Sequence, residues 1–300
     1  TTNSQNEHND DITAECTNAS SDGIYFGNAG GAGTLVATRV VTIGAGGFIS
    51  GDLQFRNFTQ VGNTAQSLTC TGTARMYNYD SNWGGDIDFI APRQLTRGTT
   101  YNRTARLEKT GADDDQSAGG NTFVMDATLV NSGSGYFMFG NGSLDDFQAN
   151  VTINNSGSDQ FYFAHNSAGN SIAGNLAVTN SNTATRVEFC DNANSTLVVS
   201  GTSDFTNTSS GDFTFMIAER GDITFDDDVT MNNNGSGATD CFYFANGTDA
   251  SIVFNGNLDI NHGTTGTTET RSYVGNQGDI TINGELTVTN ASGATNSAIY

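Results

Sequence analysis

Short runs of alternating apolar and polar residues recur along most of the chain, separated by clusters of glycine, asparagine and serine. Between residues 151 and 180 these runs include Val151 to Asn155, Phe161 to Phe163 and Ser171 to Gly174, and the first run then returns at Leu176. Alternation with a period of two is typical of a β-strand with one buried face, and polar clusters that contain glycine mark turns. The pattern predicts short strands joined by tight corners.

The first run returns at a nearly constant interval along the rest of the sequence. Its last position is held by asparagine, with one histidine, at Asn131, Asn155, Asn180, Asn207, Asn233, His262 and Asn290. Successive members of this set are roughly 24–29 residues apart, and a period of this size indicates stacked supersecondary units. Each period also contains an aromatic second run and a mainly aliphatic third run. We therefore expect three short strands in each coil.

The predicted fold is all-β: a parallel β-solenoid, expected to be a right-handed β-helix, with coils of about 24–29 residues. Equivalent side chains should then stack in columns. An aromatic core ladder of offset-stacked rings is expected from Phe139, Phe163, Phe189, Phe215 and Phe244.

Asparagine columns are expected at two corners, because asparagine tolerates the left-handed conformation and its amides can bond from coil to coil. The first is an asparagine ladder of Asn131, Asn155, Asn180, Asn207, Asn233 and Asn290, in which His262 replaces one member. The second follows the aromatic run, at Asn141, Asn166, Asn192, Asn246 and Asn276.

Four regions follow from how clearly the repeat is expressed. Residues 1–11 have no large apolar side chain and predict a disordered polar tail. Residues 12–57 hold the first coils, and within them residues 49–57 resemble a first run that ends in asparagine. Residues 58–120 break the rhythm, so we expect irregular coils with long insertions there. Residues 121–300 form the regular repeats.

The composition limits the choice of partners and of compartment. The 300-residue chain has a formal net charge of −21 and a sequence pI of about 4.1, which argues against nucleic acid or an anionic membrane as the main partner. No apolar segment approaches the ~18 residues of a membrane span, no signal peptide is present, and Thr1 reads as a processed start. The composition is similar to that of secreted bacterial surface proteins, so we expect an extracellular location, on the bacterial surface or in a fibre.

The four cysteines, Cys16, Cys70, Cys190 and Cys241, have no spacing that suggests zinc binding. Free buried thiols are the expected state, and one or two disulfides stay open as an alternative in an oxidising setting.

Three acidic clusters are the candidates for carbohydrate chemistry: Asp113–Asp115, Asp145–Asp146 and Asp226–Asp228. A glycosidase needs two carboxylates at a defined separation, and a calcium-dependent lyase needs grouped acids with a basic residue nearby. The repeat places no acidic column across neighbouring coils, so we expect solvated corners instead.

The three histidines, His8, His165 and His262, show neither metal-ligand nor triad spacing. We expect His8 in the tail, His165 on the outside and His262 at an asparagine corner. We therefore predict no catalytic, cofactor-binding or metal-binding residues and no enzymatic activity, with weak Ca²⁺ binding by the acidic loops as the one cofactor left open.

The L-x-V-x-N and F-x-F-A-x-N patterns resemble the parallel β-helix repeats of secreted bacterial adhesins and autotransporter-like passengers. The resemblance covers residues 121–300 and, less clearly, residues 12–57. It is a resemblance of fold, and by analogy it implies a role at the cell surface.

Three functions are compatible with these observations. The first is an extracellular structural protein that stacks head to tail into a filament or a stalk, with other copies of itself as partners. The second is a monomeric surface adhesin or glycan-binding passenger, in which residues 58–120 form the binding insertion. The third is a β-helix enzyme that acts on polysaccharides.

The first hypothesis rests on the ends of the repeat, where no capping pattern is found. The sequence stops at Ala298-Ile299-Tyr300, within a second run. We expect either a piece of a longer repeat protein or a second copy stacked on the open end. The expected assembly interface consists of Ile12, Cys16, Asn18, Ile24, Phe26, Ile282, Leu286, Val288, Ile299 and Tyr300.

Overall fold

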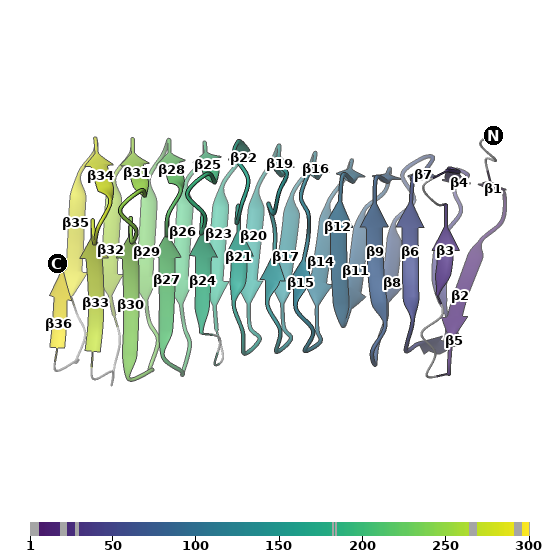
Figure 1. Cartoon of the computed structure of the whole chain (residues 1–300), viewed down its shortest axis with the longest axis horizontal. Coiled ribbons are helices and arrows are strands. Elements are labelled where there is room, and N and C mark those ends of the chain that lie inside the picture. Colours follow the sequence, from purple (N-terminus) through teal and green to yellow (C-terminus); the bar gives the residue numbers. More distant parts are fainter. Residues whose placement is uncertain are drawn as a thin grey trace.

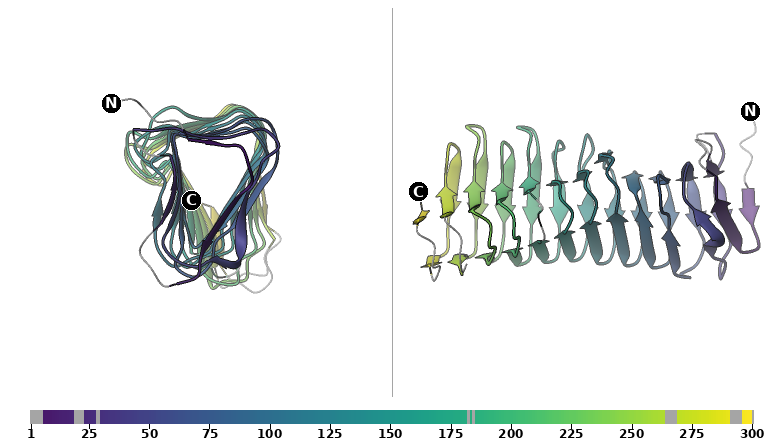
Figure 2. Two further views of the ribbon diagram at one scale, coloured as in Figure 1. Left: turned by 90° about the vertical axis from the view of Figure 1, so that its right-hand side faces the viewer. Right: turned by 90° about the horizontal axis from the view of Figure 1, so that it is seen from below.

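The three-strand repeat winds into an elongated prism, seen from the side in Figure 1 and along its axis in Figure 2. The computed structural model describes residues 6–18, 23–27, 30–181, 183, 185–263, 269–290 and 296–299. These residues form 36 strands and no helix, and strands of successive coils pair in parallel. The predicted all-β parallel solenoid with three strands per coil is therefore confirmed.

The first face of the prism is built from the first run of each coil. Its strands are β2 (Ile12–Cys16), β5 (Val41–Phe48), β8 (Gln66–Thr69), β11 (Ile87–Ala91), β14 (Ala105–Lys109), β17 (Ala127–Asn131), β20 (Val151–Asn155), β23 (Leu176–Asn180), β26 (Ser203–Asn207), β29 (Val229–Asn233), β32 (Leu258–His262) and β35 (Leu286–Asn290). Strands β2 and β5 pair with each other, and β8 to β35 form one ten-stranded sheet.

The second face carries the aromatic run. Its strands are β3 (Ile24–Phe26), β6 (Asp52–Arg56), β9 (Arg75–Tyr79), β12 (Arg93–Arg97), β15 (Asp115–Gln116), β18 (Phe137–Met138), β21 (Phe161–Phe163), β24 (Arg186–Phe189), β27 (Phe213–Ile217), β30 (Thr239–Phe244), β33 (Glu269–Val274) and β36 (Asn296–Ile299). A sheet of four strands ends at β12 and a sheet of eight begins at β15, and a bridge between Arg97 and Gly119 joins the two.

The third face is a single twelve-stranded sheet. Its strands are β1 (Asn6–His8), β4 (Gly33–Leu35), β7 (Phe58–Gln60), β10 (Asn82–Trp83), β13 (Thr100–Tyr101), β16 (Thr122–Phe123), β19 (Asp146–Phe147), β22 (Asn170–Ile172), β25 (Thr196–Val199), β28 (Asp222–Phe225), β31 (Ser251–Phe254) and β34 (Asp279–Ile282). At about 4.8 Å per strand, twelve strands make a rod roughly 50 Å long.

One hydrophobic core follows the axis from Ala14 to Ile260 without a break. Its aromatic rings contact each other from coil to coil, for example Phe123 and Phe147 with ring centroids 4.5 Å apart and planes 5° apart. Other neighbours meet edge to face, as Phe189 and Phe205 do at 5.5 Å. Both geometries are favourable for aromatic pairs, so the core mixes stacked and edge-to-face rings where offset stacking was expected throughout.

The asparagine ladder forms inside the corner between the first and second faces. The Asn155 amide donates to Asn180 at 3.2 Å, Asn180 donates to Asn207 at 3.3 Å, and Asn207 donates to Asn233 at 3.0 Å. All four side chains are fully buried, so each bond satisfies a group that water cannot reach.

Other residue types continue the asparagine ladder in both directions. His262 pairs with Asn233 in the strand register, as predicted, and its Nε2 atom lies 3.0 Å from the Ser272 hydroxyl. Burial lowers the pKa of His262. In the other direction Lys109 precedes Asn131, and its fully buried ammonium donates to the carbonyl oxygens of Gly111 and Gly135 at 2.6 and 3.0 Å.

The strand register corrects one member of the aromatic core ladder. Phe215 pairs with Val187 and Phe242, whereas Ile217 stands between Phe189 and Phe244. Phe215 therefore lies in the neighbouring column, in line with Phe161 rather than with Phe163. A shift of two residues keeps every side chain on the same face of the strand, which is why the alternating pattern did not reveal it.

The left-handed corner residues also differ from the prediction. After the second face, positive φ angles occur at Ala164, Cys190, Ala218 and Ala245, with values between 48° and 56°. The expected asparagines come one or two residues later and have no positive φ angle among the described residues; of the non-glycine corners, only Asn57 places an asparagine there. Asparagine still links the coils at this corner, since the Asn276 amide donates to Asn246 at 2.7 Å.

The first half of the rod is more regular than expected. Residues 58–120 continue all three faces, and they contain the shortest coils of the described chain: Asp88 pairs with Arg106, at a sequence separation of 18. Farther along the rod, Asn232 pairs with Asn261, at a separation of 29. The predicted long insertions are therefore wrong, and Trp83 is a fully buried core side chain.

Two further expectations for the N-terminal part are wrong. Residues 6–8 do not belong to a disordered tail, because β1 pairs with β4 and the His8 ring contacts Phe26 edge to face at 5.7 Å. Residues 49–57 do not form a first run, because Leu53 and Phe55 lie on the second face, where β6 pairs with β3 and β9.

A second ladder runs along the corner between the third and first faces. A side-chain oxygen at this corner accepts a hydrogen bond from the backbone N–H of the equivalent residue one coil later. These bonds run from Thr104 to Asp86, Asn150 to Asp126, Asn175 to Asn150, Thr202 to Asn175, Asn257 to Asp228 and Glu285 to Asn257, with lengths between 2.7 and 3.2 Å. We call this series the corner ladder.

Candidate functional site

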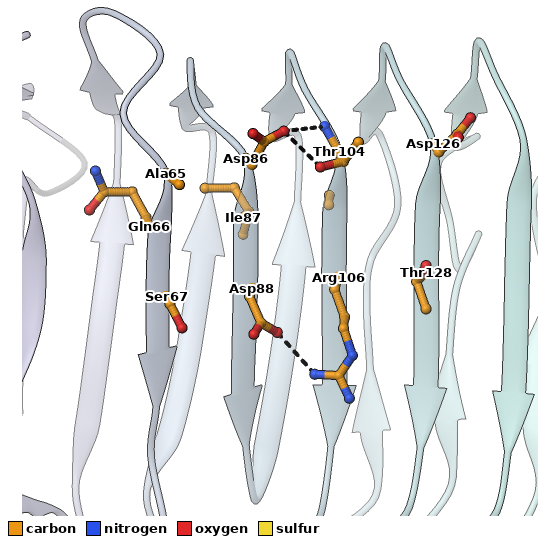
Figure 3. A pocket seen from close by; sticks show the side chains of 11 residues that line it. Ala65, Gln66, Ser67, Asp86, Ile87, Asp88, Thr104, Arg106, Asp126 and Thr128 are labelled. Carbon is orange, nitrogen blue, oxygen red and sulfur yellow. Dashed lines mark hydrogen bonds and ion pairs between the residues drawn. The ribbon is translucent and has the colours of Figure 1, made fainter. Parts of the chain in front are cut away.

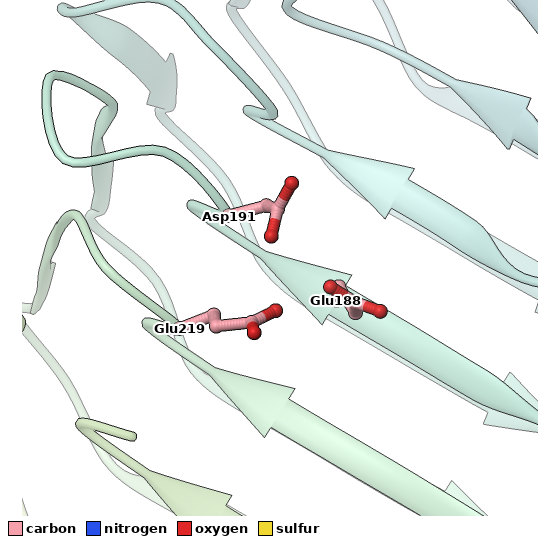
Figure 4. A group of neighbouring side chains, drawn as sticks. All are labelled: Glu188, Asp191 and Glu219. Atoms are coloured by element: carbon pink, nitrogen blue, oxygen red, sulfur yellow. The ribbon is translucent and has the colours of Figure 1, made fainter. Parts of the chain in front are cut away.

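A group of three carboxylates lies where the second face of the prism turns toward the third. Glu188 projects from β24, Asp191 follows the corner of the same coil, and Glu219 follows the corner of the next coil. Figure 4 shows the three side chains converging, and one oxygen from each lies within 4.8 Å of the others. Because Glu188 and Glu219 belong to successive coils, only the coil repeat brings them together.

Two neighbouring side chains, Arg186 and His165, hold this carboxylate group in place. Arg186, two residues before Glu188 on β24, donates to the Glu188 carboxylate at 2.8 Å. His165, from the preceding coil, places its Nδ1 atom 3.1 Å from Asp191. The Glu188 side chain is only 2 % exposed, so its position is set by packing as well as by charge.

The carboxylates differ in their protonation. Hydrogen bonding to His165 lowers the pKa of Asp191. Burial, together with the neighbouring Glu188 and Asp191, raises the pKa of Glu219 to about 9. Like charges this close do not all ionise, so the group can retain a proton on Glu219 at neutral pH. Glu188, Asp191 and Glu219 are also the described residues whose spacing suits a hard divalent cation, which prefers carboxylate oxygens.

The outer surface of the second face surrounds this group with tyrosine and arginine. Side chains that point outward from this face or its edges include Tyr25, Tyr77, Tyr79, Tyr136, Tyr162, Tyr243 and Tyr273 together with Arg56, Arg75, Arg93, Arg97, Arg186 and Arg271. These are seven of the nine tyrosines and six of the ten arginines in the chain. We call this surface the tyrosine face.

A hollow of about 370 Å³ opens on a different side, on the outer surface of β8, β11, β14 and β17. Figure 3 shows that its polar groups face one another: Asp86 accepts from the Thr104 hydroxyl at 2.7 Å, and Arg106 donates to Asp88 at 2.9 Å. Its charged groups are thus largely engaged within the protein.

The acidic clusters singled out in the sequence divide into exposed and buried members. Asp226, Asp227 and Asp228 are exposed at a corner, as expected, and so are Asp113 and Asp114. The expectation of a solvated corner is wrong for the two acids described next.

Asp115 and Asp145 are fully buried, and burial raises their pKa values to about 7 and about 6, respectively. Asp145 accepts hydrogen bonds from Asn121 and from the Gly140 backbone. The apolar neighbour Leu144 points outward instead, with 44 % of its surface exposed.

The expected assembly residues fall on strands at the two ends of the described rod. Ile12 and Cys16 lie on β2, Ile24 and Phe26 on β3, Ile282 on β34, Leu286 and Val288 on β35, and Ile299 on β36, while Asn18 follows β2. Tyr300 lies outside the described residues. The four cysteines are free thiols, and three of them are buried.

The carboxylate group and the tyrosine face were not predicted from the sequence. A usable signal exists for the tyrosine face, because outward residues occupy alternate positions of each second run, as Tyr162 does between Phe161 and Phe163. The carboxylate group has no such signal, since its members come from two corners and one strand.

The comparisons with known proteins identify no relative: no family model matches the chain, and neither a curated protein nor a solved structure matches it. Among the described residues, no helix is long and apolar enough to cross a membrane. The chain is thus a β-solenoid repeat protein on the evidence of its own register, and a role as an adhesin or autotransporter passenger stays a prediction.

Proposed function

We propose that the chain is an extracellular structural protein without enzymatic activity, a β-solenoid subunit that stacks head to tail into a filament or a stalk. The observation that carries this proposal is the uninterrupted core, which links all coils of the described rod into one body. In such a solenoid each coil is held by its neighbours, so the rod resists bending along its whole length.

The parallel register supports stacking in one direction. Strands β1, β2 and β3 form one end of the three faces, and β34, β35 and β36 form the other. Unpaired strand edges bind further strands readily, and because all strands run parallel, one end of the rod is complementary to the other. Leu286 at the second end is 43 % exposed, although its column is buried in the coils before it.

The charge distribution also favours an unlike contact over a like one. Residues 1–110 contain eight basic and ten acidic side chains, whereas residues 111–300 contain three basic and 22 acidic side chains. Contact between two acidic ends is repulsive, while contact of an acidic end with the nearly neutral end is less so.

Sedimentation velocity and negative-stain electron microscopy over a range of concentrations test this proposal. We expect filaments whose length grows with concentration. Leu286→Lys places a charge in the inward column of the edge strand and should leave monomers, whereas Thr287→Lys, one position along on the outward side of the same strand, should still assemble. A parent chain that stays monomeric at every concentration would overturn the proposal.

A further inference from the structure

The tyrosine face has the chemistry of a recognition surface rather than of a solvated wall. Tyrosine and arginine are, with tryptophan, the residues most enriched at the hot spots of protein–protein interfaces, and here they gather on one side of a rod that is otherwise rich in Asn, Thr, Ser and Asp. Tyr25 is 55 % exposed, and the other six tyrosines of the face are partly exposed. Their rings are thus accessible from solvent.

The side chains of the tyrosine face are fixed before any partner arrives. The Arg75 and Arg97 guanidinium groups lie 6.0 and 5.0 Å from the ring centroids of Tyr77 and Tyr79. Asp52 also accepts a hydrogen bond from the Arg75 Nε atom at 2.6 Å. A group that is already ordered loses little entropy on binding, and a guanidinium held by one carboxylate still has further N–H donors to offer.

The same arrangement recurs further along the rod. The rings of Tyr136 and Tyr162 meet edge to face at 5.4 Å. Those of Tyr243 and Tyr273 stack at 4.6 Å with planes 3° apart, and Arg271 donates to the Tyr273 hydroxyl at 2.8 Å. Three ring clusters therefore follow one another along the axis: Tyr77 with Tyr79, Tyr136 with Tyr162, and Tyr243 with Tyr273.

The charge of the chain limits the kind of partner. With a net charge of −21, the rod repels polyanions at long range. The arginines of the tyrosine face do not reverse this, because Arg75, Arg93, Arg97 and Arg186 each lie within 4.0 Å of a carboxylate of the same chain. A suitable partner is uncharged, has apolar faces for the tyrosine rings and presents hydroxyl groups for the fixed donors and acceptors.

We propose that the tyrosine face binds an extended, uncharged polysaccharide that lies along the solenoid axis. Sugar rings supply both an apolar C–H face and hydroxyl groups. Successive ring clusters are separated by three to four strands, which at about 4.8 Å per strand is roughly 15–20 Å. Only a long chain spans two clusters, so binding should strengthen with chain length through multivalent contact.

Affinity electrophoresis in gels that contain a soluble polysaccharide tests this proposal. The neutral probes are dextran, mannan, xyloglucan and β-glucan, each as polymer and as short oligosaccharide, and the anionic probes are alginate and heparin. We expect retardation by at least one neutral polymer, little effect of its short oligosaccharides and no retardation by the anionic polymers.

Three variants locate the contact on the molecule. The double changes Tyr77→Ala with Tyr79→Ala, and Tyr243→Ala with Tyr273→Ala, should each weaken retention by about tenfold, because each removes both rings of one cluster. The control Val198→Ala with Val253→Ala alters outward side chains of the third face and should leave retention unchanged. Circular dichroism and the melting temperature report whether each variant is folded.

Four outcomes would overturn the proposal. These are no retention by any neutral polymer, retention that the folded tyrosine variants leave unchanged, equal loss in the third-face control, and binding restricted to the anionic polymers. Filament formation is measured separately by sedimentation, so failure of glycan binding and failure of the structural role are distinguishable.

Discussion

The early and late coils of this rod share one backbone plan but fill it differently. The early coil that links Asp88 to Arg106 is short, with a sequence separation of 18, and its residues in line with the asparagine ladder are Ala91 and Lys109. The late coil that links Asn232 to Asn261 is long, with a separation of 29, and its residues in that line are Asn233 and His262. At the corner after the second face, the early coils turn on glycine, asparagine or aspartate, whereas most late coils turn on alanine or cysteine. The three-sided winding thus depends on the apolar columns, and the buried polar columns vary around it.

The largest expected effect comes from removing one core aromatic ring in the late half of the rod. Phe205 is fully buried and contacts Phe189, Phe215 and Phe225, with ring centroids 5.5 to 6.1 Å away. Phe205→Ala should lower the free energy of unfolding by about 3–5 kcal/mol. Because coils are coupled mainly to their neighbours, hydrogen exchange should rise most in the late coils.

Trp83→Ala is the matched change in the early half, where the indole contacts Phe55, Phe58 and Phe89. Its effect on exchange should be concentrated in the early coils. If both variants raised exchange equally along the whole chain, the rod would be one cooperative unit and the contrast between its halves would be only one of composition.

The second effect concerns two buried acids, one in each half. Burial raises the pKa of both Asp115 and Asp240 to about 7. Arg93 lies 3.1 Å from Asp115, whereas Asp240 forms no ion pair with any of the described residues. An unfolded aspartate titrates near pH 4, so the folded state binds more protons between about pH 4 and pH 7. The contribution of each group to the free energy of unfolding therefore decreases as pH rises through that window.

Asp240→Asn removes this titration. The variant should match the parent chain at pH 4 and be more stable at pH 8, by on the order of 4 kcal/mol. Asp279→Asn, at an exposed acid, should change neither value. Urea unfolding at both pH values measures the difference, and a gain that is the same at pH 4 as at pH 8 would show that Asp240 is already ionised in the folded chain.

The third effect tests the asparagine ladder that distinguishes the late coils. Asn180→Ala removes the bond that Asn155 donates and the bond that Asn207 accepts, both buried. Both neighbours keep other partners, because the Asn155 amide also donates to the carbonyl oxygens of Asp159 and Arg186 and the Asn207 oxygen also accepts from the Ser209 N–H. The cost is therefore the net contribution of the two lost bonds, about 0.5–1.5 kcal/mol each, and we expect a total loss of roughly 1–3 kcal/mol in urea unfolding. Asn276→Ala breaks an exposed amide–amide bond between coils and should cost less than about 0.5 kcal/mol. Equal losses would mean that burial is not what gives the ladder its strength.

The smallest effect separates the two kinds of corner. Asn57 has a φ angle of 48°, and Asn57→Gly should stabilise the chain by a few tenths of a kcal/mol, because glycine adopts this conformation without strain. Ala218→Gly should bring no such gain, since it also removes a fully buried methyl group worth about 0.8 kcal/mol. Thermal unfolding of the two variants compares them directly, and an equal gain in both would show that the Ala218 methyl adds nothing to the core.

Most of the fold could be predicted, because the alternation of apolar and polar residues and the length of the repeat are both visible in the sequence. The asparagine or histidine that ends each first run predicted how the strands of the first face align. The predicted column from Asn131 to Asn290 is the observed one. The register of β27 could not be predicted, because Phe213, Phe215 and Ile217 offer two frames that bury the same face. Residues 58–120 were expected to contain long insertions, although Trp83 and Pro92 within them belong to short coils.

The candidate site was less predictable than the fold for a physical reason. A carboxylate beside an apolar residue gives no sign of which of the two points inward, and at Leu144 and Asp145 it is the carboxylate that does. Glu188, Asp191 and Glu219 meet only once the length of one particular coil is known. The outward tyrosines were visible in the sequence, but they could be assigned to a common face only after the strands were in register.

The corner ladder gives the coils an order of folding as well as a direction along the rod. In this ladder a side-chain oxygen of one coil accepts a hydrogen bond from a backbone N–H of the next coil. The accepting residues are Asp86, Asp126, Asn150, Asn175, Asp228 and Asn257. During synthesis, which begins at the amino end, each finished turn thus presents a prepared acceptor to the segment that leaves the ribosome after it. Each folded coil is thus a template for the coil that follows it.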